Sequence, residues 1–191
     1  MPDVFDVLSK DHTEVKRMLT ELETGPTKQS GADEDQLLLR KKMTEELIIE
    51  ESRHEAVEEM YFWPAVREHV PDGDDLADEA IEQEQEGKEV LNSLDKLDAS
   101  DPEFENLLGK FTEAAREHIA FEENMVWPGL RSALTAQAAS EIGTKLSDAK
   151  KTAPTRPHPH TPPSPGALKT AGPAAAMADK VRDAMTGRGG D

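Results

Sequence analysis

The sequence predicts an all-α protein, an antiparallel up-down four-helix bundle followed by a disordered C-terminal tail rich in Pro and Ala. Three observations lead to this fold class. Apolar residues recur at three- and four-residue spacing in four long runs, breaker-rich segments separate these runs, and no stretch shows a competing strand pattern. Four amphipathic helices with short connections bury their apolar stripes against one another in such a bundle.

Charge and composition divide the chain into a bundle over residues 1–150 and a tail over residues 151–191. Residues 1–150 hold 37 acidic and 16 basic side chains, a net −21, whereas residues 151–191 hold 3 and 6, a net +3, together with seven of the thirteen prolines. Such a segment cannot build a core and is predicted to be disordered. A weak helix in "AAAMADKVRDAM", with Met177, Val181 and Met185 on one side, is the only order expected there.

The first two helices are marked by their apolar stripes and by the breakers that follow them. The first carries Phe5, Leu8 and later apolar residues up to Leu22, and it ends before "TGPTKQSG". The second begins near Asp33 and runs through Tyr61 to the breaker "VPDGDD". Both stripes follow the helical period of 3.6 residues, so each helix has one face for a core.

The third and fourth helices repeat this design. The third carries apolar residues from Leu76 to Leu94 and ends at "DASDP". The fourth is predicted to start with Ser100 or Asp101 as its cap and Pro102 in its first turn, and its stripe reaches Met125. Residues 135–150 are predicted to form a short fifth helix or a frayed extension of the fourth.

Polar side chains interrupt each apolar stripe near its middle. Burying a carboxylate costs several kcal/mol or more unless it is paired, hydrogen-bonded or bound to a metal, so several carboxylates at one level need a common partner, most simply a cation. Two of the His-Glu pairs are four residues apart, which places both side chains one turn apart on the same helix face. The candidate metal ligands are His12, His54, Glu58, Glu84, His118 and Glu122.

A sequence repeat strengthens this interpretation, because a single His-x-x-x-Glu is common by chance. "HEAVEEMYFWPAVR" starts at His54 and "HIAFEENMVWPGLR" starts at His118, and both copies continue with Glu, Trp-Pro and Arg at matching places. The first and third helices also repeat, with "DHTEVKRMLTEL" aligned over "QEQEGKEVLNSL", so that His12 falls opposite Glu84. The sequence therefore predicts a duplicated helical hairpin with two equivalent half-sites and two metal ions.

With these motifs, residues 3–134 resemble a hemerythrin-like domain of the HHE cation-binding type, whose pattern is His, His-x-x-x-Glu, His, His-x-x-x-Glu on four helices. The resemblance implies a non-haem centre of two iron ions, with an oxo or hydroxo bridge and two bridging Glu carboxylates. It carries over to His12, His54, Glu58, His118 and Glu122. The family's third-helix His is Glu84 here, so either Glu84 ligates as a carboxylate or that metal keeps an open or water-filled position.

The departure at Glu84 bears on the expected chemistry. An added anionic ligand stabilises Fe(III) relative to Fe(II), which disfavours a reduced form waiting for O₂. The favoured function is redox defence through a catalase-like decomposition of H₂O₂. An O₂- or NO-binding or sensing module, an iron store and a purely structural bundle are the alternatives.

Other residues near the predicted site have two interpretations each. Tyr61, the only tyrosine, lies seven residues after His54 on the same stripe, and is a candidate catalytic residue that hydrogen-bonds a bound peroxide or ligates metal. Core packing with a polar tip is the alternative. Glu50 is either a hydrogen-bond acceptor for the ring N–H of His54 or a solvated residue. Trp63 and Trp127 are predicted to be structural plugs at the end of the bundle.

Composition also limits the partners and the compartment. A net charge of −18 and a pI near 4.7 argue against general nucleic-acid binding and against binding to anionic membranes. The chain has no cysteine, so a metal must be held by His and carboxylates. No leader pattern and no long apolar run is present, and a cytoplasmic location is expected. The expected partners are small molecules such as O₂, H₂O₂ and NO, and a protein partner of the tail is left open.

Overall fold

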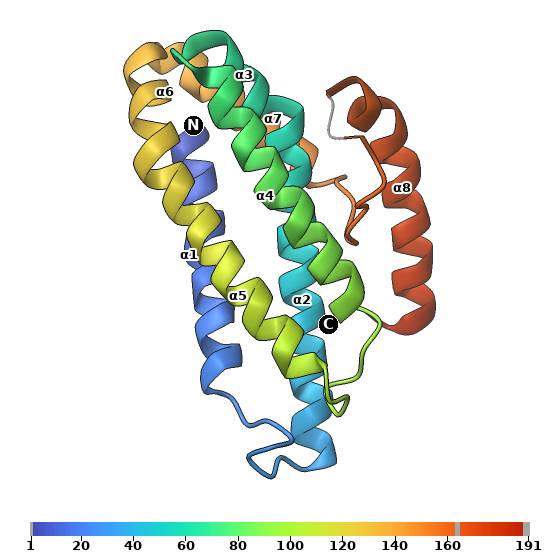
Figure 1. Ribbon diagram of the computed structural model, residues 1–191. Helices are drawn as coiled ribbons and strands as arrows, with labels where there is room; N and C mark the ends of the chain where they lie inside the picture. The colour runs from blue at the N-terminus through green and yellow to red at the C-terminus, as the bar shows by residue number, and fades with distance from the viewer. Residues whose placement is uncertain (1, 163–164, 189–191) are drawn as a thin grey trace.

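The computed structural model describes residues 2–162 and 165–188, and within these ranges the chain is helical and contains no strand. The long helices lie side by side, and successive ones run in opposite directions (Figure 1). They are α1 (Val4–Thr24), α2 (Glu34–Val57), α4 (Gly73–Leu94) and α5 (Phe104–Phe121). The predicted all-α class is confirmed. None of the helices in the described ranges combines the length and hydrophobicity that a membrane crossing requires.

The predicted count of four helices is too simple, because two of the long helices continue beyond a π-helical turn. α2 leads through η1 (Glu58–Phe62) into α3 (Trp63–His69). α5 leads in the same way through η2 (Glu122–Val126) into α6 (Trp127–Ala133). Both π turns begin at the Glu of the repeated motif, so the repeat in sequence is also a repeat in backbone. Single π turns inside helices are frequent at functional sites.

The start of α2 agrees with the sequence, and the start of α5 departs from it. α2 begins next to Asp33, as predicted, and the Asp33 side chain caps it in a capping box. The predicted cap of the fourth helix is wrong, since α5 starts at Phe104 and its N-cap residue makes no side-chain cap hydrogen bond. Asp101 instead accepts a hydrogen bond from the backbone N–H of Asp98 at 2.7 Å, within the preceding turn.

The core consists of two apolar clusters that lie along the bundle on either side of the candidate ligands. Along α1, Leu8 belongs to the first cluster and Val15 to the second, with His12 between them. The second cluster contains fully buried side chains such as Leu47 and Leu91. Both ends of the bundle therefore have apolar cores of their own. Each fully buried Leu in them stabilises the fold by about 1.5–3 kcal/mol.

The predicted fifth helix is present as α7 (Ala136–Lys150), which packs on α1 and α2. Gly143 permits this approach: a Cβ atom there would lie 2.6 Å from the carbonyl carbon of Asp3. Any larger residue at this position would push α7 away from the start of α1. This helix therefore adds a further layer to the outer side of the bundle.

The tail differs from the predicted disordered segment. It contains helix α8 (Pro165–Thr186), which lies along the bundle (Figure 1). The apolar side of this helix faces away from the bundle, since Met177 and Met185 are 70 % and 82 % exposed, whereas Asp179 is fully buried. Ion pairs of Arg156 with Asp95 and Asp183 help to hold the tail, and hydrophobic periodicity cannot indicate such contacts.

Candidate metal centre

The six predicted ligands come together in the middle of the bundle. They form two groups in which the possible ligand atoms lie within 4.8 Å of one another. The first group is His12, His54, Glu58 and Glu122, and the second is Glu58, Glu84 and His118. Glu58 belongs to both. Glu122 also lies between the groups, with Oε2 at 3.0 Å from Nε2 of His12 and Oε1 at 3.5 Å from Nε2 of His118.

The polar atoms that face this centre have no hydrogen-bond partners in the described chain. They are Nε2 of His12, His54 and His118, both carboxylate oxygens of Glu58 and Glu122, and Oε2 of Glu84. Leaving one such buried group unpaired costs about 1–3 kcal/mol, and more for a charged group. Imidazole nitrogens and carboxylate oxygens that converge in this way are the donors that divalent and trivalent metal ions use, so these residues fit a metal centre.

The opposite ring nitrogen of each histidine faces an outer polar residue. Nδ1 of His12 lies 3.0 Å from Glu123, and Nδ1 of His118 lies 2.9 Å from the side-chain oxygen of Gln83. Nδ1 of His54 lies 3.5 Å from Asp11. An acceptor at Nδ1 keeps the proton there and turns the Nε2 lone pair towards the centre.

The outer partners of His54 and His118 are residues that sequence reasoning missed. Glu50, the predicted partner of His54, instead pairs with Lys150 of α7 at 3.0 Å. Lys150 also holds Asp11 at 2.7 Å. The duplication contained a signal, because Asp11 and Gln83 each stand immediately before the first-helix ligand of their copy.

The family model of the hemerythrin HHE cation binding domain matches residues 3–130, two thirds of the chain. The chain belongs to the hemerythrin HHE family. An uncharacterized hemerythrin-like protein of Schizosaccharomyces pombe is 26 % identical over 186 residues, which cover 97 % of this chain and 87 % of that protein. The family model describes a cation-binding domain, and the ligand groups described above are the candidate site for a cation within the matched residues.

Two further similarities are more distant. A hemerythrin HHE cation binding domain-containing protein from Mycobacterium kansasii shares the fold with a TM-score of 0.66 at 21 % identity, over 94 % of this chain and 99 % of that one. A DNA nickase from Nostoc sp. is 23 % identical over 148 residues, which are 78 % of this chain but only 39 % of that protein. The first of these shows that the common architecture extends over nearly the whole hemerythrin-like chain.

Glu84, where this hemerythrin-like chain departs from the histidine pattern, has its own set of partners. Nε1 of Trp63 donates a hydrogen bond to Oε1 of Glu84. Nζ of Lys88 lies 3.8 Å from Oε2 of Glu84 and also pairs with Glu59. These contacts place a donor and a positive charge beside a carboxylate that stands where the duplicate half has His12.

The two repeated tryptophans contact the centre, a role that the sequence interpretation as structural plugs did not include. Trp63 is fully buried and bonds Glu84, as described above. Trp127 stacks on His12, with ring centroids 5.1 Å apart and an interplanar angle of 17°. Each Trp therefore contacts the first-helix ligand of one half-site, so the Trp-Pro signature orients ligands as well as filling the core.

Burial and neighbouring charges set the protonation of the centre without metal. Burial, together with the charges of Glu122 and Glu84, raises the pKa of Glu58 well above its ordinary value. Burial lowers the pKa of His118 to about 4, so its ring is neutral near pH 7. Burial alone would raise the pKa of Glu122, but the adjacent histidines outweigh it and hold this pKa at about 2. Metal ions bind deprotonated ligands, so a bound cation would stabilise the ionised form of Glu58 that burial disfavours.

Tyr61 is partly buried in η1 and packs against the first apolar cluster. It is not a member of either ligand group. Its packing agrees with the structural alternative, and a role near a bound oxidant stays a prediction.

Proposed function

We propose that this hemerythrin-like protein is a non-haem di-iron protein that reacts with small oxidants, with H₂O₂ disproportionation as its favoured activity. The observation that supports this proposal is the pair of ligand groups that share Glu58. Mixed imidazole and carboxylate donors suit iron, manganese and zinc, and a buried pair of half-sites favours iron for redox work. Bound iron supplies the electron transfer that protein side chains lack.

The protein's own residues position and shield the reaction. Glu58 and Glu122 lie between the two half-sites and would hold the bound iron together with the histidines. Each of the three histidine rings turns Nε2 towards the centre. The Nδ1 atoms on their other sides face Glu123, Asp11 and Gln83, and these contacts fix the orientation of the rings. Apolar clusters above and below the centre keep bulk water away.

Glu84 supports peroxide chemistry over reversible O₂ carriage. Its carboxylate adds a negative charge where the family pattern has a neutral histidine, and negative charge favours the more oxidised state of a bound metal ion. A reduced centre ready for O₂ is then less stable. O₂ or NO sensing and iron storage without catalysis are the competing functions. The DNA nickase similarity is not extended to this chain, since a net charge of −18 opposes binding to DNA phosphates.

The test combines metal analysis with a peroxide assay on the purified full chain. We expect iron in the preparation, a near-ultraviolet and visible spectrum of a di-iron protein, and O₂ evolution after H₂O₂ is added. A Glu58→Gln and Glu122→Gln double variant serves as the metal-depleted control. An iron-loaded protein that evolves O₂ no faster than this control would contradict peroxide disproportionation, and spectral changes with O₂ or NO alone would favour the sensing alternative.

A further inference from the structure

Two Lys-Glu pairs that are equivalent by the duplication differ greatly in exposure. Lys16 pairs with Glu123 at 2.8 Å, and these side chains are 44 % and 33 % exposed. Lys88 pairs with Glu59, and these side chains are 11 % and 3 % exposed. One face of the centre therefore opens towards solvent, while its pseudo-symmetric counterpart is covered.

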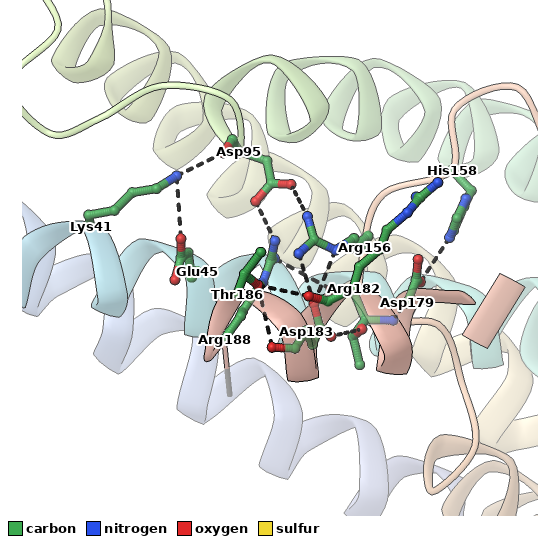
Figure 2. Close-up of polar contacts among 11 residues, drawn as sticks. Lys41, Glu45, Asp95, Arg156, His158, Asp179, Arg182, Asp183, Thr186 and Arg188 are labelled. Carbon is green, nitrogen blue, oxygen red and sulfur yellow. Dashed lines mark hydrogen bonds and ion pairs between the residues drawn. The ribbon is translucent and has the colours of Figure 1, made fainter. Parts of the chain in front are cut away.

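The cover over Lys88 and Glu59 is the C-terminal part of the chain, residues 153–162 and 165–188, which we call the strap. Asp95, at the end of α4, binds Arg156 at 2.9 Å and also pairs with Arg188 (Figure 2). Arg156 in turn binds Asp183 of α8 at 2.9 Å. These ion pairs fasten the strap to the bundle at Asp95.

A second set of contacts closes the strap on itself. The hydroxyl of Thr155 donates to Asp183 at 2.6 Å, and its backbone N–H donates to Asp179 at 3.1 Å. His158 lies 2.9 Å from the same Asp179 carboxylate (Figure 2). Asp95, Asp179 and Asp183 are therefore the three carboxylates on which the closed arrangement depends.

A cavity of about 30 Å³ remains between the strap and the bundle. Ser52, Glu55, Glu59 and Lys88 line its bundle side. A water needs roughly 10–15 Å³ measured in this way, so the cavity holds one or two waters or one molecule of similar size. Larger ligands do not fit while the strap is closed.

The cavity wall contains buried polar atoms that lack a hydrogen-bond partner among the described residues. They are Oγ of Ser52 and Oε2 of Glu55, whose residues are only 5 % and 4 % exposed; the Glu55 oxygen has Nζ of Lys88 at 3.9 Å as an ion-pair partner. A small molecule that both donates and accepts hydrogen bonds would satisfy both atoms. Lys88 connects this place to the centre, since it lines the cavity and its Nζ lies 3.8 Å from Glu84.

We propose that the strap closes over a binding cavity for one neutral hydrogen-bonding molecule of the size of water or H₂O₂, beside the Glu84 half of the centre. The strap excludes larger molecules, and opening it requires release of the Asp95 contacts. Only the assignment of H₂O₂ to the cavity rests on the proposed function. The closure and the size limit follow from the strap and the cavity alone.

The natural chain has no cysteine, so a single introduced thiol can report on the cavity. Ser52→Cys places a thiol in the wall, and Ser132→Cys provides an exposed reference. The full chain is loaded with zinc, which has no redox chemistry and does not consume peroxide. Labelling with N-ethylmaleimide, a neutral reagent too large for the cavity, should be at least about 100-fold slower for Ser52→Cys than for Ser132→Cys.

Opening the strap should remove this protection. In the Ser52→Cys background, we expect maleimide labelling of the thiol to become at least about tenfold faster when three changes are combined: Asp95→Asn, Asp179→Asn and Asp183→Asn. Asp95→Asn alone should raise the labelling rate by a smaller factor. Glu23→Gln is the matched control, because it removes an exposed inter-helix pair with Arg116 far from the strap. Equal maleimide rates with and without the strap contacts would overturn the closure, and the single variant gives this answer if the triple variant does not fold.

The size limit is tested with H₂O₂ on the same proteins. Loss of the Ser52→Cys thiol, counted after unfolding, should proceed in H₂O₂ at nearly the same rate with the strap closed or open. If the closed strap slows oxidation by H₂O₂ as strongly as labelling by maleimide, the cavity does not admit a molecule of this size. Neither measurement needs iron or turnover, so failure here is distinguishable from failure of the proposed function.

Discussion

Lys88 lies one turn after Glu84 on α4, with its Nζ 3.8 Å from the Oε2 atom of that carboxylate. The same places in the other half of the duplication are taken by Lys16 and His12. Lys16 there pairs with Glu123, which in turn faces the Nδ1 atom of His12. The two halves thus use the same lysine position, in one half directly beside a carboxylate candidate ligand and in the other behind a histidine.

This asymmetry predicts the effect of Glu84→His on the iron-loaded protein. The change removes a negative charge from the centre and restores the family's histidine pattern, so the Fe(III)/Fe(II) potential should rise. We expect a rise of at least about 60 mV, a tenfold change for a one-electron couple. A spectroelectrochemical titration measures the potential, and O₂ evolution from H₂O₂ should change in parallel.

Glu86→His on the exposed side of α4 is the control for Glu84→His, and its potential should match that of the natural protein. If Glu84→His keeps both the potential and the peroxide activity, Glu84 does not ligate metal. The preference for peroxide chemistry over O₂ carriage then has no basis.

The two ligand groups predict that His118→Ala lowers the iron content from two ions per chain to one. His118 belongs only to the group with Glu58 and Glu84, and its loss leaves the other group of four ligands complete. Iron per chain is measured by elemental analysis after removal of loosely bound metal. His69→Ala, a change at the exposed end of α3, should keep two ions. Two tightly held ions in the His118→Ala variant would be incompatible with this division of the site.

The position of the centre between two apolar clusters predicts that Glu58→Ala with Glu122→Ala abolishes metal binding and preserves the fold. Both clusters remain intact in this variant, and it loses four buried oxygens that have no hydrogen-bond partner among the described residues. Helical circular dichroism should stay largely unchanged, and the Tm of the metal-free variant should be no lower than that of the metal-free natural chain. Loss of helicity would instead show that metal binding supplies folding free energy.

The clustering of the six candidate ligands was predictable from sequence because the repeat imposes two constraints at once. His-x-x-x-Glu occurs twice on apolar stripes, and the alignment of the first and third helices places Glu84 opposite His12. The same alignment pairs Asp11 with Gln83, but a polar residue beside a stripe has no distinguishing period. Its role becomes visible only when helices from different parts of the chain are packed together.

The strap was not predictable in the same way. Hydrophobic periodicity identifies helices that bury an apolar face, whereas α8 turns Met177 and Met185 outwards and buries Asp179 and Asp183. Its order depends on ion pairs with Asp95, more than fifty residues earlier in the chain. Such pairs depend on exact placement in space, which neither composition nor hydrophobic periodicity encodes.

Hydrophobic periodicity also mispredicted the burial of α2. It predicts one buried stripe, whereas α2 buries residues on more than one face. α7 packs on this helix and α8 on the η1 turn that continues it, so Glu51 is only 6 % exposed. Burial, with a further contribution from the charge of Glu122, raises the pKa of Glu51 to about 8 although Lys150 opposes the shift. The ordinary value for this side chain is 4.5.

The raised pKa of Glu51 predicts a pH-dependent stability for the metal-free chain. Between pH 4.5 and 8 the unfolded chain has lost this proton and the folded chain retains it, so the contribution of Glu51 to stability falls as the pH rises through this window. Glu51→Gln is neutral at every pH and should therefore gain free energy of unfolding relative to the natural chain at pH 8, by at most about 5 kcal/mol, but not at pH 4.5. Urea unfolding of both proteins at several pH values measures this difference, with Glu46→Gln on the exposed side of α2 as the control. A difference between Glu51→Gln and the natural chain that stays constant from pH 4.5 to 8 would show that Glu51 titrates normally and that α7 and α8 do not shield it from water.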